Sequence, residues 1–233
     1  MNVVITGATK GIGKSIALRF ASEGFNIAAC ARNKGDLDHL SDELKEINPA
    51  VEVYTARTDV SKKEDVYKFI NGTVQKMGSI DILINNAGVY LPGKITEEAE
   101  GTLEKLIDTN VYSAYHATRA ALPFMEGGKK PHIFNICSIA SIIAYPGGGS
   151  YTISKFAMLG FSKVLREELK PQGIRVTAVM PGATWTDSWA GVDLPHERIM
   201  EARDIADSIY SIYSLGPTAV VEEIIIRPQL GDL

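Results

Sequence analysis

The sequence is poor in cysteine and histidine, which leaves little material for a thiol nucleophile or a metal site. Only Cys30 and Cys137 occur in the 233 residues, and each lies in an apolar stretch. A free cysteine in such a stretch acts as a small hydrophobic side chain more often than as a nucleophile or ligand. The four histidines are scattered without the spacing of metal ligands. We therefore expect no metal site and no cysteine chemistry.

An excess of charge of either sign is also absent. The chain carries 24 basic and 28 acidic residues, a formal net charge of -4, spread along its length. This balance predicts neither a basic face for nucleic acid nor a polybasic segment for anionic lipid. No apolar run reaches the roughly 18 residues of a membrane span, and residues 1–7 lack the features of a secretory signal. We expect a cytoplasmic protein that binds a small molecule, with neither nucleic acid nor membrane as a partner.

The hydrophobic pattern indicates an α/β fold. Apolar runs of strand length alternate with segments of helical period, as in repeated βαβ units with a parallel sheet. Several runs, such as residues 80–84, lack polar alternation, which is typical of strands covered by helices on both faces. We therefore predict a doubly wound, mostly parallel sheet of seven strands. They are expected near Asn2–Thr6, Phe25–Ala31, Val51–Arg57, Ile80–Asn85, His132–Cys137, Arg175–Met180 and Glu222–Arg227.

Helices are expected between these strands. Ser61 and Glu64 have the spacing of a capping box at the start of the third helix. No repeat or polar linker separates a second domain, so residues 1–233 are expected to form one domain. In such sheets ligands bind beyond the carboxyl ends of the strands. The helices are expected at Gly11–Ser22, Lys34–Glu46, Lys62–Met77, Glu97–Met125 and Tyr151–Leu169, with one or two pieces within Gly191–Leu215.

A glycine-rich turn follows the first expected strand. Gly7, Gly11 and Gly13 stand between that strand and the first helix, where the backbone can approach a phosphate closely. The free N–H groups and the positive dipole end of the helix stabilise an anion there. A diphosphate group is therefore expected at this turn, and a purely structural turn is the alternative.

The residue after the second strand points to the type of dinucleotide. A fold that prefers NAD places an acidic side chain there, on the ribose 2′-hydroxyl. In this sequence Arg32 stands at that position, and its guanidinium suits a 2′-phosphate. Lys10 in the glycine turn adds a second positive charge. The expected cofactor is NADP(H), and the alternative is that both are solvated surface residues.

A tyrosine and a lysine share one face of an expected helix. Tyr151 and Lys155 are four residues apart, and a nearby ammonium favours the phenolate form of a tyrosine. Ser138 stands directly beyond the fifth strand, and Asn110 lies in the long helix after the fourth. This ordered set and the Thr-Gly-x-x-x-Gly-x-Gly turn resemble the short-chain dehydrogenase/reductase family, which has a Rossmann fold. The resemblance extends from about residue 3 to residue 227.

The resemblance implies a role for each member of the set. Tyr151 is expected to be the general acid that protonates a carbonyl oxygen, and the base in the reverse direction. Lys155 is expected to favour the phenolate and to bind the nicotinamide ribose, and Ser138 to orient the carbonyl. Asn110 is expected to hold a water that links Lys155 to solvent, while a bend in its helix is the structural alternative.

The resemblance also implies the cofactor contacts. The pair Asp59 and Val60 is expected at the adenine, although Asp59 can equally be a helix-entry residue. The segment 85–88 is expected to brace the central sheet and to form the floor under the cofactor. The Pro-Gly segment after the sixth strand is expected to contact the nicotinamide, with a plain turn as its alternative. The expected cofactor-binding residues are Gly7, Thr9, Lys10, Gly11, Ile12, Gly13, Arg32, Asp59, Val60, Asn86, Ala87, Gly88, Tyr151, Lys155, Pro181, Gly182 and Thr184.

The implied activity is the NADP(H)-dependent interconversion of a carbonyl and an alcohol. Residues 184–189 and 220–228 resemble bacterial sepiapterin-reductase-like members, so a pterin ketone is one candidate substrate and a 3-oxoacyl thioester is another. A non-catalytic NADP-binding sensor or scaffold is a third possibility, and the presence of Ser138, Tyr151 and Lys155 disfavours it.

The substrate side is expected in the short segment at about residues 183–217. Its apolar wall is predicted to contain Trp185, Trp189 and Leu194, opposite Tyr90, Tyr145 and Pro146. The chain ends soon after its last strand, so no long tail is expected to close the site. The resemblance further implies a homodimer or homotetramer, formed through the long helices that begin near residues 97 and 151, with the last strand as a further candidate for the interface.

Overall fold

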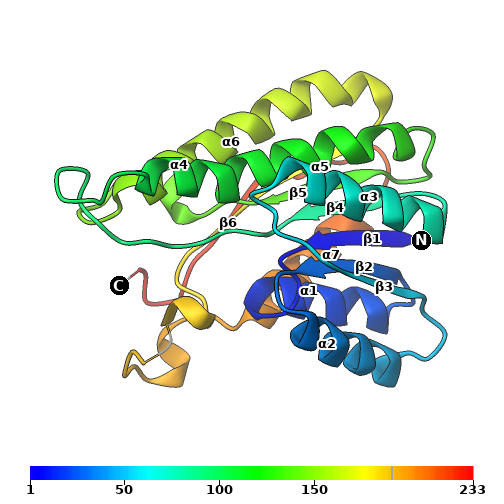
Figure 1. The fold of residues 1–233 in the computed structure, drawn as a ribbon, viewed down its shortest axis with the longest axis horizontal. Helices are drawn as coiled ribbons and strands as arrows, with labels where there is room; N and C mark the ends of the chain where they lie inside the picture. The colour runs from blue at the N-terminus through cyan, green and yellow to red at the C-terminus, as the bar shows by residue number, and fades with distance from the viewer. Residues whose placement is uncertain (190, 233) are drawn as a thin grey trace.

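The fold is built on one parallel sheet. The computed structural model describes residues 1–189 and 191–232. Within these residues, seven strands pair in parallel in the order β3-β2-β1-β4-β5-β6-β7 (Figure 1). This confirms the predicted doubly wound sheet, and each strand lies within two residues of its expected bounds. The strands are β1 (Asn2–Thr6), β2 (Asn26–Ala31), β3 (Val53–Arg57), β4 (Ile82–Asn85), β5 (His132–Ile136), β6 (Arg175–Pro181) and β7 (Glu223–Ile226).

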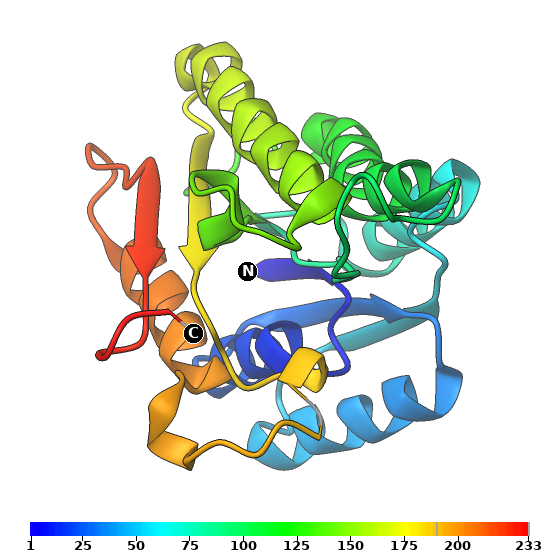
Figure 2. The same ribbon diagram turned by 90° about the vertical axis from the view of Figure 1, so that its left-hand side faces the viewer.

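Helices cover both faces of the sheet (Figure 2). One face carries α1 (Gly11–Ser22), α2 (Lys34–Ile47) and α7 (Ala202–Ser214), and the other carries α3 (Lys63–Met77), α4 (Thr102–Ile107), α5 (Ser113–Ala121) and α6 (Gly149–Leu169). In β1, Val3 and Ile5 pack into the core of the first face and Val4 into that of the second. The strand is therefore apolar throughout. None of the described helices is long and apolar enough to cross a membrane.

The long helix expected after the fourth strand is interrupted. It begins only at Thr102, because Gly101 has a φ of +83° that an α-helix cannot contain. A π-helical turn at Asp108–Tyr112 separates α4 from α5, and a 3-10 turn that contains Pro123 ends the segment. Turns of the π type are frequent at functional sites, and this one carries Asn110.

The capping box expected at the start of α3 is wrong. The Ser61 hydroxyl and amide both donate to Asp59 Oδ1, at 2.7 and 3.2 Å. This tight turn takes up the Ser61 side chain before the helix begins at Lys63, so it does not cap the first turn of α3.

The chain between β6 and α7 folds back beside the turn between β1 and α1 (Figure 2). This segment, residues 182–201, contains two short 3-10 turns, at Asp187–Trp189 and His196–Arg198. A single β-bridge pairs Thr184 with Met200. The segment therefore borders the carboxyl end of the sheet.

Candidate active site

A large cleft opens at the carboxyl end of the sheet. Its volume is about 1640 Å³, and it is lined by residues that follow β1 to β7 and by the first turns of α6. Every catalytic and cofactor residue expected from the sequence lines this cleft except Gly13 and Asn110. The order of the strands reverses between β1 and β4, which is where ligands bind in open α/β sheets.

The glycine turn has the conformation that a close backbone approach requires. Gly7 and Gly11 have φ values of +66° and +51°, which disfavour other residues. Gly13 lies behind the turn: a Cβ there would stand 2.3 Å from the Gly7 carbonyl oxygen and 2.4 Å from Asn86 Nδ2. Gly13 therefore has a packing role, because any side chain would push α1 away from the turn after β1.

Asn86 braces the same turn from β4. Its Nδ2 donates to the carbonyl oxygens of Thr6 and Gly7, at 3.0 and 2.8 Å. Thr6 Oγ1 in return accepts from the amides of Asn86 and Ala87, both at 3.1 Å. These four bonds join the ends of the two central strands, so the floor of the cleft is rigid where the glycine turn begins.

Positive charge lies at the β2 end of the cleft. Arg32 lines it directly after β2, and Asp59 lines it after β3, where the hydrogen bond from Ser61 lowers the pKa of the Asp59 carboxyl. Lys10 Nζ lies 2.9 Å from Asp187 Oδ2 in the segment after β6. Both side chains of this ion pair are more than 60% exposed, so the pair contributes little and leaves Lys10 free to exchange partners.

Ser138, Tyr151 and Lys155 line one wall of the cleft. Ser138 Oγ accepts a hydrogen bond from the Ala140 amide at 3.1 Å, which holds the side chain at the end of β5. Lys155 is buried, and its Nζ donates to the Ile136 carbonyl oxygen at 3.0 Å. The same Nζ lies 5.8 Å from the centre of the Tyr151 ring. The ammonium thus lies beside the phenol, as the spacing along the helix predicts.

Asn110 lies behind this wall rather than in it. Its Oδ1 accepts from the Val89 amide at 2.8 Å, and its Nδ2 donates to the Val89 carbonyl oxygen and to Ser154 Oγ, each at 3.0 Å. Ser154 Oγ donates in turn to the Tyr151 carbonyl oxygen at 2.7 Å. Asn110 therefore ties the loop after β4 to the helix that carries Tyr151.

Aromatic side chains surround the mouth of the cleft. The Tyr90 ring packs edge-on against Tyr151 with 4.9 Å between centroids. Burial raises the pKa of Tyr145, and the neighbouring Tyr90 and Tyr151 raise it further. Trp189 lines the opposite side, as expected.

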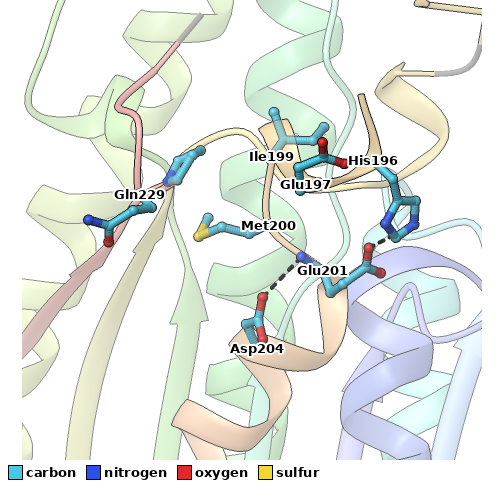
Figure 3. A pocket seen from close by; sticks show the side chains of 8 residues that line it. His196, Glu197, Ile199, Met200, Glu201, Asp204 and Gln229 are labelled. Carbon is cyan, nitrogen blue, oxygen red and sulfur yellow. Dashed lines mark hydrogen bonds and ion pairs between the residues drawn. The ribbon is translucent and has the colours of Figure 1, made fainter. Parts of the chain in front are cut away.

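The predicted wall is otherwise incomplete. Among the described residues, Trp185, Leu194 and Pro146 do not line the cleft. Trp185 instead stacks on His196 and donates to its carbonyl oxygen at 2.7 Å. A smaller hollow next to this stack is bordered by His196 and Glu201, with His196 Nε2 3.0 Å from Glu201 Oε1 (Figure 3). Trp185 thus stabilises the fold of the segment instead of facing a substrate.

The short tail after β7 reaches the cleft, which the sequence did not predict. Arg227 and Asp232 both line it and form an ion pair of 2.6 Å. Arg198 donates to the carbonyl oxygens of Gly231 and Asp232, at 2.9 and 3.1 Å. Arg227 directly follows a strand, so its place was predictable by the same rule as that of Ser138. Asp232 carries no such signal.

Comparison with known proteins identifies the family. Residues 1–195 match the family model described as short chain dehydrogenase. The protein is therefore an oxidoreductase of the short-chain dehydrogenase/reductase family, as the sequence resemblance implied.

Relatives match over nearly the whole chain. Sepiapterin reductase of Chlorobaculum tepidum is 34% identical over 239 aligned positions, covering 99% of this chain and 97% of that protein. An uncharacterized oxidoreductase of Staphylococcus saprophyticus is also 34% identical, over 227 positions, covering 97% and 96%. This similarity includes the segments after β6 and β7, which line the cleft.

Solved structures share the fold. An alcohol dehydrogenase from the archaeon Thermococcus sibiricus, complexed with 5-hydroxy-NADP, superimposes with a TM-score of 0.89 at 28% identity, covering 98% of this chain and 96% of that one. The closed form of a serine dehydrogenase complexed with NADP+ has a TM-score of 0.89 at 27% identity, covering 100% and 97%.

Proposed function

We propose that the protein is an NADP(H)-dependent reductase of ketones or aldehydes, which also oxidises the corresponding alcohols. The observation that carries this proposal is the single cleft shared by the glycine turn and by Ser138, Tyr151 and Lys155. A dinucleotide whose diphosphate lies at the turn would place its other end toward that wall, where a carbonyl group can be reduced.

The residues present fit such a cofactor. The turn offers backbone without side chains at Gly7 and Gly11, next to the N-terminus of α1. Arg32 is suited to a 2′-phosphate, and the two structural relatives named above were solved with NADP or a derivative. When bound, the nicotinamide would supply or accept the hydride.

The side chains of the wall are assigned the other steps of the reaction. Tyr151 donates a proton to the carbonyl oxygen during reduction and removes it in the reverse direction. The Lys155 ammonium, held by Ile136, stabilises the phenolate left on Tyr151. Ser138 lies beside them and orients the carbonyl oxygen by a hydrogen bond. Asn110 supports this arrangement through Ser154.

A pterin ketone is the proposed substrate class. One of the relatives is a sepiapterin reductase, and Tyr90, Tyr145 and Trp189 give the mouth of the cleft flat aromatic surfaces. Aromatic side chains of this kind stack on a planar heterocycle with a favourable free energy of about 1 kcal/mol each.

Calorimetric titration with NADPH and, separately, with NADH tests the cofactor. We expect clearly tighter binding of NADPH, and binding of neither would contradict the proposal.

Oxidation of NADPH in the presence of sepiapterin then tests the reaction. Tight NADPH binding without turnover of sepiapterin or of simple ketones would favour a non-catalytic NADP-binding protein.

We also propose that a second copy of this chain covers the outer face of α5 and α6. Tyr112, Tyr115, Ile153, Phe156 and Val164 are large apolar side chains, and each is 37% to 55% exposed there. Large apolar side chains that gather on an exposed surface are typical of an interface.

A further inference from the structure

A glutamate in the loop after β4 reaches the start of α6. Glu98 Oε1 accepts a hydrogen bond from the Ser150 amide at 2.8 Å, and the Ser150 hydroxyl donates to Glu98 Oε2. The amide of Gly93 donates to the Gly147 carbonyl oxygen at 2.9 Å and brings the same two segments together. Ser150 is buried and directly precedes Tyr151. Glu98 is therefore bonded to the residue next to the proposed proton donor.

The first turn of α6 has no cap of its own. The first N–H groups of a helix have no partner within it, and a side chain at the N-cap usually accepts from one of them. Here the N-cap is Gly148, and the first turn contains no acidic residue. Glu98 supplies the missing acceptor from a distant part of the chain. Its negative charge also lies at the positive end of the helix dipole, where it is stabilising.

The local sequence makes room for this contact. Gly149 has a φ of +37°, and a Cβ there would stand 2.1 Å from Glu98 Oε1. A Cβ at Gly93 would stand 2.8 Å from Glu98 Cγ. Glycines on both sides thus let the carboxylate approach the helix. No local signal in the sequence relates Glu98 to a residue 52 positions away.

The same loop contacts Tyr151 from a second side. Its residue Val89 is held by Asn110, which also binds Ser154 one turn into α6. Tyr90 follows and packs its ring against that of Tyr151. The loop is thus joined to α6 on either side of Tyr151, at Ser150 and at Ser154.

We propose that Glu98 is a positioning residue, whose carboxylate holds the first turn of α6 and so sets the place of Tyr151 in the cleft. The inference rests on the proposed role of Tyr151 in proton transfer. Displacing a reacting group by about 1 Å lowers a rate by up to about 100-fold. Glu98→Ala is therefore expected to lower kcat by about 10- to 100-fold, with the affinity for NADPH changed less than about twofold, because the glycine turn lies elsewhere.

Glu98→Gln separates position from charge. Its amide oxygen can still accept from the Ser150 amide, so this variant is expected to recover most of kcat. The lost negative charge favours the phenolate of Tyr151. The pH midpoint of kcat should therefore fall by about 0.2 to 0.7 unit, the size of a charge interaction with a helix end. A residue that served stability alone would not move this midpoint.

Glu97→Ala is the matched control, because Glu97 is the adjacent residue, with an exposed ion pair to Lys94. Two readouts are compared among the four proteins: the pH profile of kcat with NADPH, and amide hydrogen exchange in a peptide covering residues 147–156. We expect faster exchange in Glu98→Ala alone and the lowered midpoint in both Glu98 variants, because both lack the negative charge. Exchange and profiles equal to those of Glu97→Ala would overturn the proposal.

The two readouts keep the two proposals apart. An absence of turnover in the unmodified protein would contradict the proposed function. The exchange measurement needs no turnover and still tests the Glu98 contact. If Glu98→Ala fails to fold, Glu98→Gln still tests the proposal through its pH profile, because it keeps an acceptor for the Ser150 amide and lacks only the charge; an unchanged midpoint would then overturn the proposal.

Discussion

At the scale of single residues, the proposed catalytic side chains are held mainly through backbone groups. Lys155 binds the Ile136 carbonyl oxygen, and Ser138 accepts from the Ala140 amide. Because these partners belong to the backbone, the positions of the two side chains depend little on the neighbouring side chains. Removing one functional group from this wall should therefore change chemistry more than structure.

Tyr151→Phe tests the proton donor. The substitution removes the hydroxyl and keeps the ring that packs against Tyr90. General acid catalysis contributes about 100- to 10,000-fold, so kcat for ketone reduction should fall by at least about 100-fold. The Kd of NADPH should stay within about twofold, as measured by calorimetry. Retained turnover would assign the proton transfer to a different group.

Arg32→Asp tests the choice of cofactor. Arg32 lines the cleft after β2, and a carboxylate there would repel a 2′-phosphate and accept a hydrogen bond from a 2′-hydroxyl. A hydrogen bond to a charged group contributes about 1.5 to 3 kcal/mol, so the preference for NADPH over NADH should fall by about 10- to 100-fold. The ratio of the two Kd values measures this.

The same charge change far from the cleft is the control for Arg32. Arg203 in α7 is 84% exposed and pairs with Asp207, so Arg203→Asp should leave the ratio unchanged. Equal ratios in both variants would remove Arg32 from the phosphate site.

Site residues were predictable from the sequence where they directly follow the end of a strand. Ser138 and Arg32 each follow an apolar run directly, and the rule for parallel sheets brings such positions to one edge. Lys10 is different, because its ion pair with Asp187 joins residues 177 positions apart. Asp187 and Glu98 are polar and lie on irregular segments. No periodic pattern marks the partners of such residues.

At the scale of elements, strands were better predicted than helix ends. Buried parallel strands need continuous apolar runs, and those runs define their bounds. The break in the helix after β4 depends on Gly101, whose left-handed conformation is not visible in a helical pattern. The cap at Ser61 failed because the Ser61 side chain turns back to Asp59, to which its hydroxyl donates, and the helix begins two residues later at Lys63.

Gly13→Ala tests how α1 packs against the glycine turn. The added Cβ would meet the Gly7 carbonyl oxygen and Asn86 Nδ2 at less than 2.5 Å, so α1 or the brace from β4 must move. The gain in helix propensity is about 1 kcal/mol, and overpacking costs about 1 to 3 kcal/mol. We expect a net loss in the free energy of unfolding, measured by urea denaturation, and weaker NADPH binding.

Ser15→Ala is the control for Gly13→Ala, because it introduces an alanine two residues further along the same helix. Ser15 is partly exposed and lies outside the cleft, so its replacement should keep both stability and NADPH binding. If Gly13→Ala behaves like this control, the packing role of Gly13 is wrong.

At the scale of the whole molecule, the exposed apolar face of α5 and α6 leads to a prediction about assembly. Phe156→Glu places a charge on this face, and burying an unpaired charge is strongly unfavourable. The mass measured by light scattering should fall to that of a smaller assembly. Ile47→Glu is matched, because Phe156 and Ile47 are both 45% exposed and Ile47 lies at the end of α2. Equal masses for both variants would place the interface elsewhere.

The stability of the whole molecule should also depend on one buried histidine. His132 in β5 is fully buried, with Nε2 2.8 Å from Thr177 Oγ1 and Nδ1 without a hydrogen-bond partner among the described residues. Burial and the charge of Arg175 hold the pKa of His132 well below its usual range. The folded state therefore keeps this ring neutral, whereas the unfolded chain binds a proton below about pH 6.5.

The stabilisation is thus complete above that pH and is lost as the pH falls below it, by up to about 1.4 kcal/mol per pH unit. Urea denaturation between about pH 7 and about pH 5.5 measures this slope, above the range where carboxylates titrate. His132→Leu should flatten it, because Thr177 keeps its bond to the Val221 carbonyl oxygen at 2.6 Å. His116→Asn removes a partly exposed histidine whose pKa is also lowered by burial, and it should flatten the slope less. A slope in His132→Leu equal to that of the unmodified protein would mean that His132 is protonated in the folded state or is not the residue that sets acid stability.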